Sequence, residues 1–236
     1  MQVLEAGSRT TARRVFRIAR TLQPFALRLN PRHATETACL TARHDRTMPV
    51  RPGCVVRRAS QRRDTYMNSV HKMVAQYTKM LRNLDTWLVK ANEFAEKRKI
   101  EPTVLLETRL YPDMRPLMFQ IQSACDGAKF FVARLSGKEP PKHPDTEKTL
   151  DEVRARIRTV VDYCNGFGES DFNGAEERAV PLGFMPGKGL RGTDFINELN
   201  LPNTYFHLSM AYAILRKSGV ELGKQDFLGS LNLIDI

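Results

Sequence analysis

The sequence predicts an all-α protein whose core is a four-helix bundle. Three observations support this fold class. Four segments carry apolar residues at the i, i+3, i+4, i+7 spacing of one helix face. A proline-rich segment between the second and the third is longer than an antiparallel helix hairpin requires, which indicates a long crossover. A glycine-rich stretch before the fourth helix has the pattern of a small β-hairpin.

The chain divides by composition into two parts. The 236 residues have a formal net charge of +11. Residues 1–66 hold 14 arginines, no lysine and four acidic residues, a net charge of +10, which leaves +1 for residues 67–236. We therefore predict an Arg-rich N-terminal extension, disordered or targeting, at residues 1–66 and the bundle domain at residues 67–236.

Three interpretations of the N-terminal extension remain open. An Arg-rich, acid-poor N-terminus is typical of a mitochondrial transit peptide. The same composition fits a disordered extension without an address. The third interpretation is that translation starts at Met67, where the composition changes. We therefore predict a cytoplasmic protein, or a mitochondrial one if residues 1–66 are a transit peptide.

The first two long helices are predicted at residues 68–98 and 112–136. Apolar residues follow the helical period from Val70 to Ala95, and the basic residues at 97–99 suit a helix C-terminus. A short helical turn or loop is expected at residues 103–109. The second helix should end where Gly137 supplies a left-handed cap.

The second half of the bundle follows a crossover at residues 138–148. The third helix is predicted at residues 146–165, with Thr149 and Glu152 at the spacing of a capping box. A hairpin is predicted at residues 178–192. The fourth helix should run from residue 193 or 194 to 219, with a kink at Pro202, because proline removes one backbone hydrogen bond.

Composition and motifs also limit the partners. The four cysteines, Cys39, Cys54, Cys125 and Cys164, have no zinc-binding spacing. Cys125 and Cys164 fall on apolar helix faces and fit small buried side chains, with a catalytic thiol as the alternative. No run approaches 18 apolar residues, so no membrane span is expected. The basic N-terminal part lacks interleaved aromatic residues, so no nucleic-acid partner is expected.

The candidate site lies on the fourth helix, where two polar residues interrupt the apolar face. On a helical wheel of about 100° per residue, Asn203 and His207 fall within the apolar stripe. An unpaired buried polar group costs on the order of 1–3 kcal/mol, so the pair needs partners. We expect the His207 imidazole to be mostly shielded from water and to face the second helix near Gln122 or Asp126.

Three segments resemble an uncharacterised domain-of-unknown-function family that is related to the DinB/YfiT-like bundles. They are QYTKMLRNLDTWLVKA at residues 76–91, VLLETRLYPDMRPLMFQIQSACDGAKFFVARLSG at 104–137 and FHLSMAYAILRKSGVELGKQDFLG at 206–229. The resemblance covers about residues 67–231. It implies a DinB-like up-down-down-up four-helix bundle and, because such bundles often pair through helix faces, a homodimer.

The resemblance also implies a metal site that this chain has largely lost. Many members of the wider superfamily bind zinc or nickel through three histidines, one on the second helix and two, spaced H-x3-H, on the fourth. His207 precedes Gly219 by 12 residues and so matches the second histidine of that pair, while Asn203 replaces the first. The second helix offers no histidine. Neutral amides are poor zinc ligands. We therefore expect no cofactor; the alternative is a zinc or nickel ion held weakly by His207.

Three functions remain open at this stage. The first is a metal-free bundle that binds a small ligand or a partner, with the pocket candidates His207, Asn203, Tyr205, Gln120, Gln122 and Asp126. The second is a metal- or thiol-dependent transferase or hydrolase of the DinB/YfiT type, in which His207 acts as general base. The third is a structural module that forms dimers.

Overall fold

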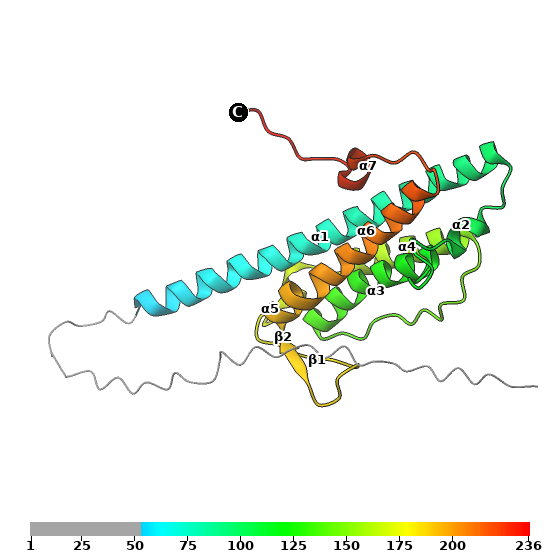
Figure 1. Cartoon of the computed structure of the whole chain (residues 1–236). Helices are drawn as coiled ribbons and strands as arrows, with labels where there is room; N and C mark the ends of the chain where they lie inside the picture. The colour runs from blue at the N-terminus through cyan, green and yellow to red at the C-terminus, as the bar shows by residue number, and fades with distance from the viewer. Residues whose placement is uncertain (1–52) are drawn as a thin grey trace, which may run out of the picture. The chain divides into compact units, whose positions relative to one another are not determined.

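The computed structural model describes the backbone of residues 53–236 and the side chains from Val70 onward (Figure 1). The first 52 residues of the predicted N-terminal extension lie outside this described part. Within it, no helix is both long enough and apolar enough to cross a membrane.

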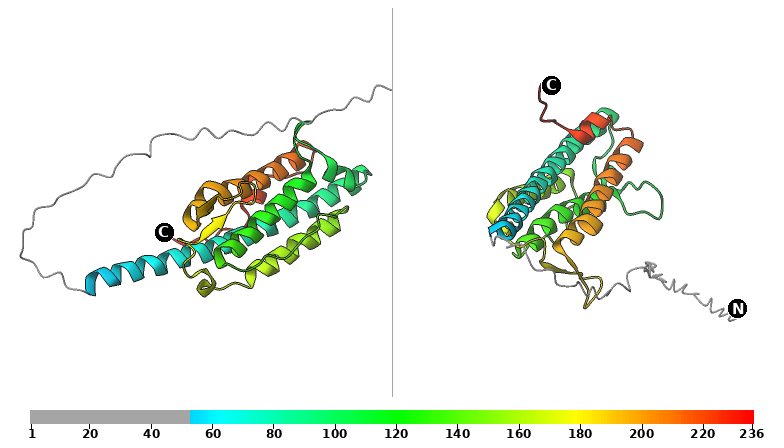
Figure 2. Two further views of the ribbon diagram at one scale, coloured as in Figure 1. Left: turned by 90° about the horizontal axis from the view of Figure 1, so that it is seen from below. Right: turned by 90° about the vertical axis from the view of Figure 1, so that its left-hand side faces the viewer.

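Four long helices form a bundle, and their long axes run side by side in both views of Figure 2. The long helices are α1 (Gly53–Arg98), α3 (Leu117–Ser136), α4 (Leu150–Asn165) and α6 (Leu201–Lys217). The shorter elements are α2 (Thr103–Glu107), the 3-10 helix η1 (Glu169–Phe172), the strands β1 (Ala179–Pro181) and β2 (Gly189–Arg191), α5 (Gly192–Asp194), the π-helix η2 (Phe195–Asn200) and α7 (Lys224–Leu228). The protein is therefore all-α apart from one two-stranded hairpin, as the sequence predicts.

Contacts at the helix ends give the directions of the helices. Lys138, just after α3, pairs with Asp171, just after α4, at 2.7 Å, so α3 and α4 end on the same side of the bundle. Lys217, at the end of α6, donates to the carbonyl of Arg109, ahead of α3, at 2.9 Å. Helices α3 and α6 are therefore antiparallel. The order is up-down-down-up, which confirms the fold implied by the resemblance.

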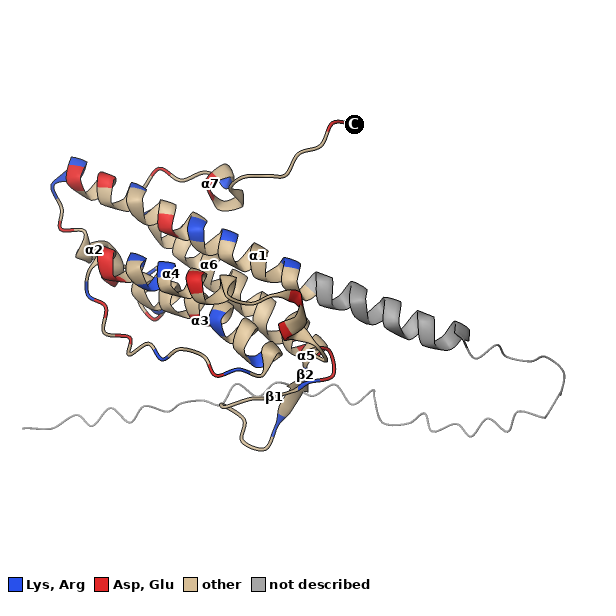
Figure 3. Ribbon diagram, turned by 180° about the vertical axis from the view of Figure 1, so that it is seen from behind, with Lys and Arg blue, Asp and Glu red and all other residues tan. Residues whose placement is uncertain are grey.

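Helix α1 is longer than predicted. It begins at Gly53 and has 46 residues, whereas the apolar stripe predicted a start at residue 68. The prediction used only the apolar stripe. Arginine, alanine and glutamine also favour helix by their intrinsic propensity, and these residues are frequent between positions 57 and 63. Figure 3 shows acidic and basic residues mixed along the part of α1 where side chains are described.

Helix α3 begins later than predicted, at Leu117 rather than at residue 112. Pro116 precedes it in an extended conformation, with φ −69° and ψ 169°. A proline disfavours helical geometry in the residue before it, so the helix cannot reach back through Arg115. The C-terminal end is as predicted: Gly137 has φ +76° and its N–H donates to the carbonyl of Ala133.

The predicted crossover is present, and α4 ends at Asn165 as predicted but begins at Leu150 and not at residue 146. Thr149 and Glu152 form the capping box, with the Glu152 N–H donating to Thr149 Oγ1 at 3.2 Å. The crossover runs back along α3, since Lys129 contacts His143 at 3.2 Å and Gln122 donates to Glu147 at 3.0 Å. It thereby covers one face of α3.

The predicted hairpin is present, with Ala179 opposite Arg191 and Pro181 opposite Gly189. The predicted last helix is present from Gly192 to Lys217, close to the predicted 193 or 194 to 219, but it is not α-helical throughout. The π-helix η2 precedes α6, and the Leu201 N–H donates to the carbonyl of Ile196, five residues back. Pro202 lies in the first turn of α6. The wide π turn ends directly before the proline, where an α-helix would have to break or kink.

The core contains the apolar stripes of all four long helices, and Trp87 and Phe131 are among its largest fully buried side chains. Where α3 meets α6, a Cβ atom at Gly127 would overlap Thr204 Oγ1. The two backbones therefore approach closely at this point. The C-terminal segment covers α1: the Trp87 indole donates to the Asp226 carbonyl at 2.9 Å, and its ring stacks on Phe227.

Candidate functional site

His207 forms a defined hydrogen bond with Gln120 of α3. The imidazole Nδ1 lies 2.8 Å from Gln120 Oε1, and Gln120 Nε2 donates to the carbonyl of Arg115 at 3.1 Å. The second bond assigns the amide oxygen to the side that faces the imidazole. Nδ1 therefore carries the hydrogen, and Nε2 is the ring nitrogen with a free lone pair.

The environment keeps this imidazole neutral. Burial lowers the pKa of His207 below its ordinary value of 6.5. Phe119 and Phe206 approach the ring edge-on, at centroid distances of 5.9 and 5.3 Å. Gln120 is only 3% exposed, so it is a buried support behind a half-buried histidine. The arrangement holds the ring in one orientation with Nε2 as a hydrogen-bond acceptor.

His207 lines an open groove of about 230 Å³ between α3 and the η2–α6 segment, which we call the α3–α6 groove. One wall consists of residues at helical spacing on α3: Ser123, Asp126, Gly127, Phe130 and Arg134. The opposite wall consists of Phe195, Leu199, Asn200, Asn203 and His207. Phe184, from the turn of the hairpin, also contributes to the lining.

The buried polar residue of this wall is Asn200, which the sequence analysis missed. Asn200 accepts a hydrogen bond from the Tyr77 hydroxyl at 2.6 Å and donates to the carbonyl of Gly127 at 3.0 Å. Asn203, predicted to lie in the buried stripe, is exposed at the groove. Asn203 lies at the edge of the buried face of α6, because that face is centred on Thr204, Leu208 and Ala211 and not on His207. A regular wheel places Asn200 about 20° from His207, so the helical period was the sequence signal for Asn200.

The structure brings together only part of the predicted pocket. Asn203, His207 and Asp126 line the groove, and Gln120 supports His207 from behind. His207 faces the second long helix, α3, as expected, but its hydrogen-bond partner is Gln120 and not Gln122 or Asp126. Gln122 lies on the opposite side of α3, bonded to Glu147. Tyr205 points to α1, where its hydroxyl accepts from Gln76 at 2.9 Å.

Beside the groove lies a set of charged residues that we call the buried ion cluster because its two cations, Lys129 and Arg156, are buried. Its carboxylates are those of Asp126, Asp145 and Glu147. The Arg156 guanidinium contacts Asp126 and Glu147 at 3.0 Å each, and also pairs with Asp145. Lys129 pairs with Asp126 at 2.7 Å. The carboxylate of Asp126 is thus neutralised by two cations.

The residues do not fit the three-histidine metal site that the resemblance implies. In the part of the chain that the structure describes, no three His, Cys, Asp or Glu side chains are arranged to hold a metal ion. His207 has only amides and aromatic rings as described partners. The thiols do not help, because burial raises the pKa of both Cys125 and Cys164 to about 12.

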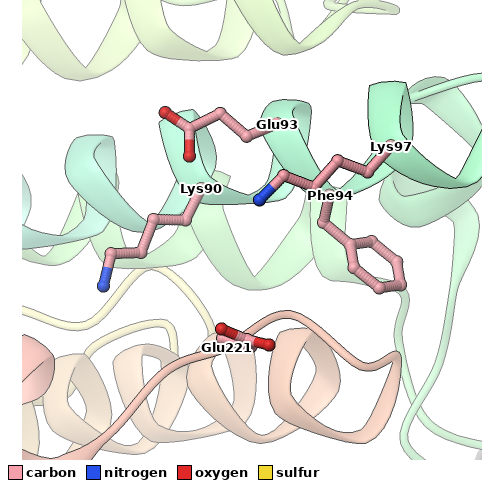
Figure 4. Close-up of a pocket in the computed structure, with 5 residues that line it drawn as sticks. All are labelled: Lys90, Glu93, Phe94, Lys97 and Glu221. Atoms are coloured by element: carbon pink, nitrogen blue, oxygen red, sulfur yellow. The ribbon is translucent and has the colours of Figure 1, made fainter.

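A second hollow, of about 160 Å³, lies at the far end of α1. Figure 4 shows Lys90, Glu93, Phe94 and Lys97 on α1, with Glu221 facing them from the segment after α6. Lys90 already pairs with Asp226 at 2.6 Å. This hollow marks where the C-terminal segment crosses α1, and it lacks the fixed acceptor that His207 gives the α3–α6 groove.

Residues 70–228 match the family described as domain of unknown function DUF1993. The chain belongs to the DUF1993 family. This DUF1993 chain also matches a solved structure of a DinB family member protein from Shewanella denitrificans, with 43% sequence identity and a TM-score of 0.71. That match covers 73% of this chain and 99% of the other. The family is therefore related to the DinB-like proteins. No protein with a curated description matches the chain.

Proposed function

We propose that this DUF1993 protein binds a small molecule in the α3–α6 groove and needs no metal to do so. The observation that carries the proposal is the Gln120–His207 hydrogen bond. It fixes the imidazole tautomer and leaves Nε2 to a ligand. Ligand sites typically combine apolar walls with a few fixed polar groups, and the aromatic lining of this groove fits that description.

The burial of Gln120 behind His207 favours a role for His207 in ligand binding over a role in core packing alone. A histidine that serves only packing needs its own polar atoms satisfied. Here the buried residue is Gln120, while the ring itself is half-buried and borders open space. The Gln120–His207 arrangement therefore presents an acceptor at the groove.

The same geometry supports a second candidate function, a transferase or hydrolase of the DinB type. A general base must be unprotonated at working pH and must hold its accepting atom in place. Burial lowers the pKa of His207, and Gln120 orients the ring. His207 Nε2 would then accept a proton from a bound nucleophile. Binding is common to both functions, so it is the property to test first.

The test uses N-phenyl-1-naphthylamine, a neutral aromatic amine whose fluorescence rises in apolar surroundings. Its N–H can donate to Nε2, and its rings can pack on Phe130. We expect saturable binding that weakens about tenfold in His207→Ala, the loss of one hydrogen bond. His71→Ala, a histidine on α1 outside the groove, is the matched control and should bind normally.

Two outcomes would refute the proposal. One is binding that is equally strong in wild type and in His207→Ala. The other is binding that requires added zinc or nickel or disappears with a chelator, which would favour the metal-dependent alternative. The homodimer stays a proposal of its own, and light scattering on the purified chain tests it.

A further inference from the structure

Arg134 is the cation of the α3–α6 groove, and aromatic rings hold it there. Its guanidinium carbon lies 4.9 Å from the centroid of the Phe130 ring and 5.4 Å from that of Phe195. All three residues line the groove. Contact with two ring faces fixes the planar group and leaves its in-plane N–H donors free to engage a ligand edge-on.

Arg134 differs from three shielded cations on α3 and α4. Arg156, Lys129 and Arg154 each have a carboxylate within 3.0 Å. In the part of the chain that the structure describes, Arg134 has no acidic partner, and burial alone lowers its pKa. A partly desolvated charge without a counter-ion is unfavourable, and a bound anion would relieve it.

The acidic residue that lines the groove, Asp126, does not pair with Arg134. Asp126 lies eight residues before Arg134 on α3, about 12 Å along the helix axis. Its carboxylate is already paired with Lys129 and Arg156. The Arg134 end of the groove therefore presents uncompensated positive charge, while the middle is neutral.

We infer that the ligand of the groove is an organic anion with a flat apolar body. Its carboxylate, sulfonate or phosphate group pairs with Arg134. Its body packs on Phe130 and on Phe184, which is 68% exposed at the hairpin turn and lines the groove. An Arg guanidinium can bind two oxygens of such a group with two parallel hydrogen bonds, so the charged group sets the orientation of the ligand. This inference rests on the proposed function, since it names the class of ligand for the same site.

The experiment compares two probes that share one aromatic body. 8-Anilinonaphthalene-1-sulfonate carries a sulfonate, and N-phenyl-1-naphthylamine lacks it. We expect the sulfonate probe to bind wild type on the order of 10- to 100-fold more tightly, the strength of one charge-assisted contact. Arg134→Gln should remove this preference and change the affinity for the neutral probe less than about twofold. Arg82→Gln, an exposed arginine on α1, is the matched control and should keep the preference.

The outcomes separate the two proposals. If neither probe responds to Phe130→Ala or His207→Ala, the proposed function fails. If the neutral probe binds the groove but the sulfonate gives no preference, or Arg134→Gln leaves the preference intact, the anion inference fails alone. A further measurement uses the wild type alone, so it does not depend on whether a variant folds. Raising the salt concentration should weaken binding of the sulfonate probe and leave binding of the neutral probe unchanged. Equal salt dependence of both probes would overturn the inference.

Discussion

Helix α3 has two polar faces, which differ in whether their charged side chains are paired. On the face toward α4 and the crossover, Arg156 pairs with three carboxylates and Lys129 pairs with Asp126. On the face toward α6, Arg134 has no acidic partner among the described residues, and His207 Nε2 has no described donor. Both faces place polar groups next to the same apolar core.

The difference separates polar groups that hold the fold from polar groups available to a ligand. The buried ion cluster ties the crossover to α3 and α4, and its members satisfy one another. The groove holds its polar groups in place, through Gln120 behind His207 and aromatic rings around Arg134, yet leaves their remaining hydrogen-bonding capacity open. Substitutions in the buried ion cluster should therefore mainly lower stability, whereas substitutions in the groove should mainly weaken ligand binding.

The largest stability effect is expected for Arg156→Met. The substitution leaves Glu147, which is 12% exposed, and Asp145, which is 55% exposed, without their cation. Because water can partly solvate these carboxylates, the expected cost is about 2–3 kcal/mol in free energy of unfolding. Arg134→Met loses no acidic partner and should cost less than about 1 kcal/mol. Urea denaturation of both variants measures the contrast. Equal costs would show that the two faces do not differ as described.

Arg158→Met is the control for helix α4 itself. Its side chain is exposed on the same helix, and its nearest acidic contact, to Asp85, is 4.0 Å long. The expected change in free energy of unfolding is within about 0.5 kcal/mol. A loss as large as that of Arg156→Met would mean that the effect belongs to the helix and not to the buried ion cluster.

The next effect is expected at the floor of the groove, for Gly127→Ala. The added methyl group would overlap Thr204 Oγ1 and force α3 away from α6. Overpacking of this kind costs about 1–3 kcal/mol. The cost should be smaller in a Thr204→Ala background, which removes the hydroxyl that the methyl group meets. Additive costs in the double-mutant cycle would contradict a direct contact.

The regular elements could be predicted from the sequence, because their signals are local. The Thr149–Glu152 capping box and the Gly137 cap are set by residues within one turn, and both form as expected. The pairing of the hairpin also agrees. These features depend on periodicity and on short-range backbone chemistry, which a single sequence contains. The direction of the helices agrees with what the resemblance to the DinB-like bundles implies, and no local pattern predicts it.

The candidate site was harder to predict, because it depends on where the buried face of α6 is centred and on long-range partners. The wheel was centred on His207, whereas the buried residues Thr204, Leu208 and Ala211 centre that face to one side of it, so Asn203 lies at the exposed edge. The partner of His207 is 87 residues away in the chain. Among several polar residues on α3, only the actual packing selects Gln120. No local sequence pattern marks Arg134. What distinguishes it is that it has no acidic partner among the described residues, and that depends on the fold.

A smaller effect is expected at His207. His207→Ala leaves Gln120 Oε1 buried without its donor and should cost about 1–2 kcal/mol in free energy of unfolding. His207→Gln keeps an N–H donor and should cost less than about 1 kcal/mol. A chelator should leave the melting temperature of wild type unchanged. A lowered melting temperature, or equal costs for both variants, would point to metal ligation instead.

The smallest effect, and the one that compares the two faces most directly, is in the titration of two histidines. Burial lowers the pKa of His207 on the groove face. On the other face, burial and the neighbouring charges of Lys129 and Arg156 lower the pKa of His143. Both pKa values lie below the ordinary 6.5, so the unfolded state binds more protons as the pH falls through that value. Stability should therefore be full above about pH 7 and fall as the pH drops below 6.5, until each native imidazole is protonated.

An anion in the groove should move only one of these histidines. The sulfonate of 8-anilinonaphthalene-1-sulfonate pairs with Arg134, while the bound rings shield His207 from water, so the probe favours the neutral imidazole and lowers its pKa further. His143 lies among the paired charges of the other face and should not respond. Imidazole proton shifts in nuclear magnetic resonance, recorded from pH 4 to 8 with and without the probe and assigned with His207→Gln, measure both. If both histidines shift together, or if only His143 shifts, the probe does not occupy the groove, and the distinction between the two faces of α3 would not extend to ligand binding.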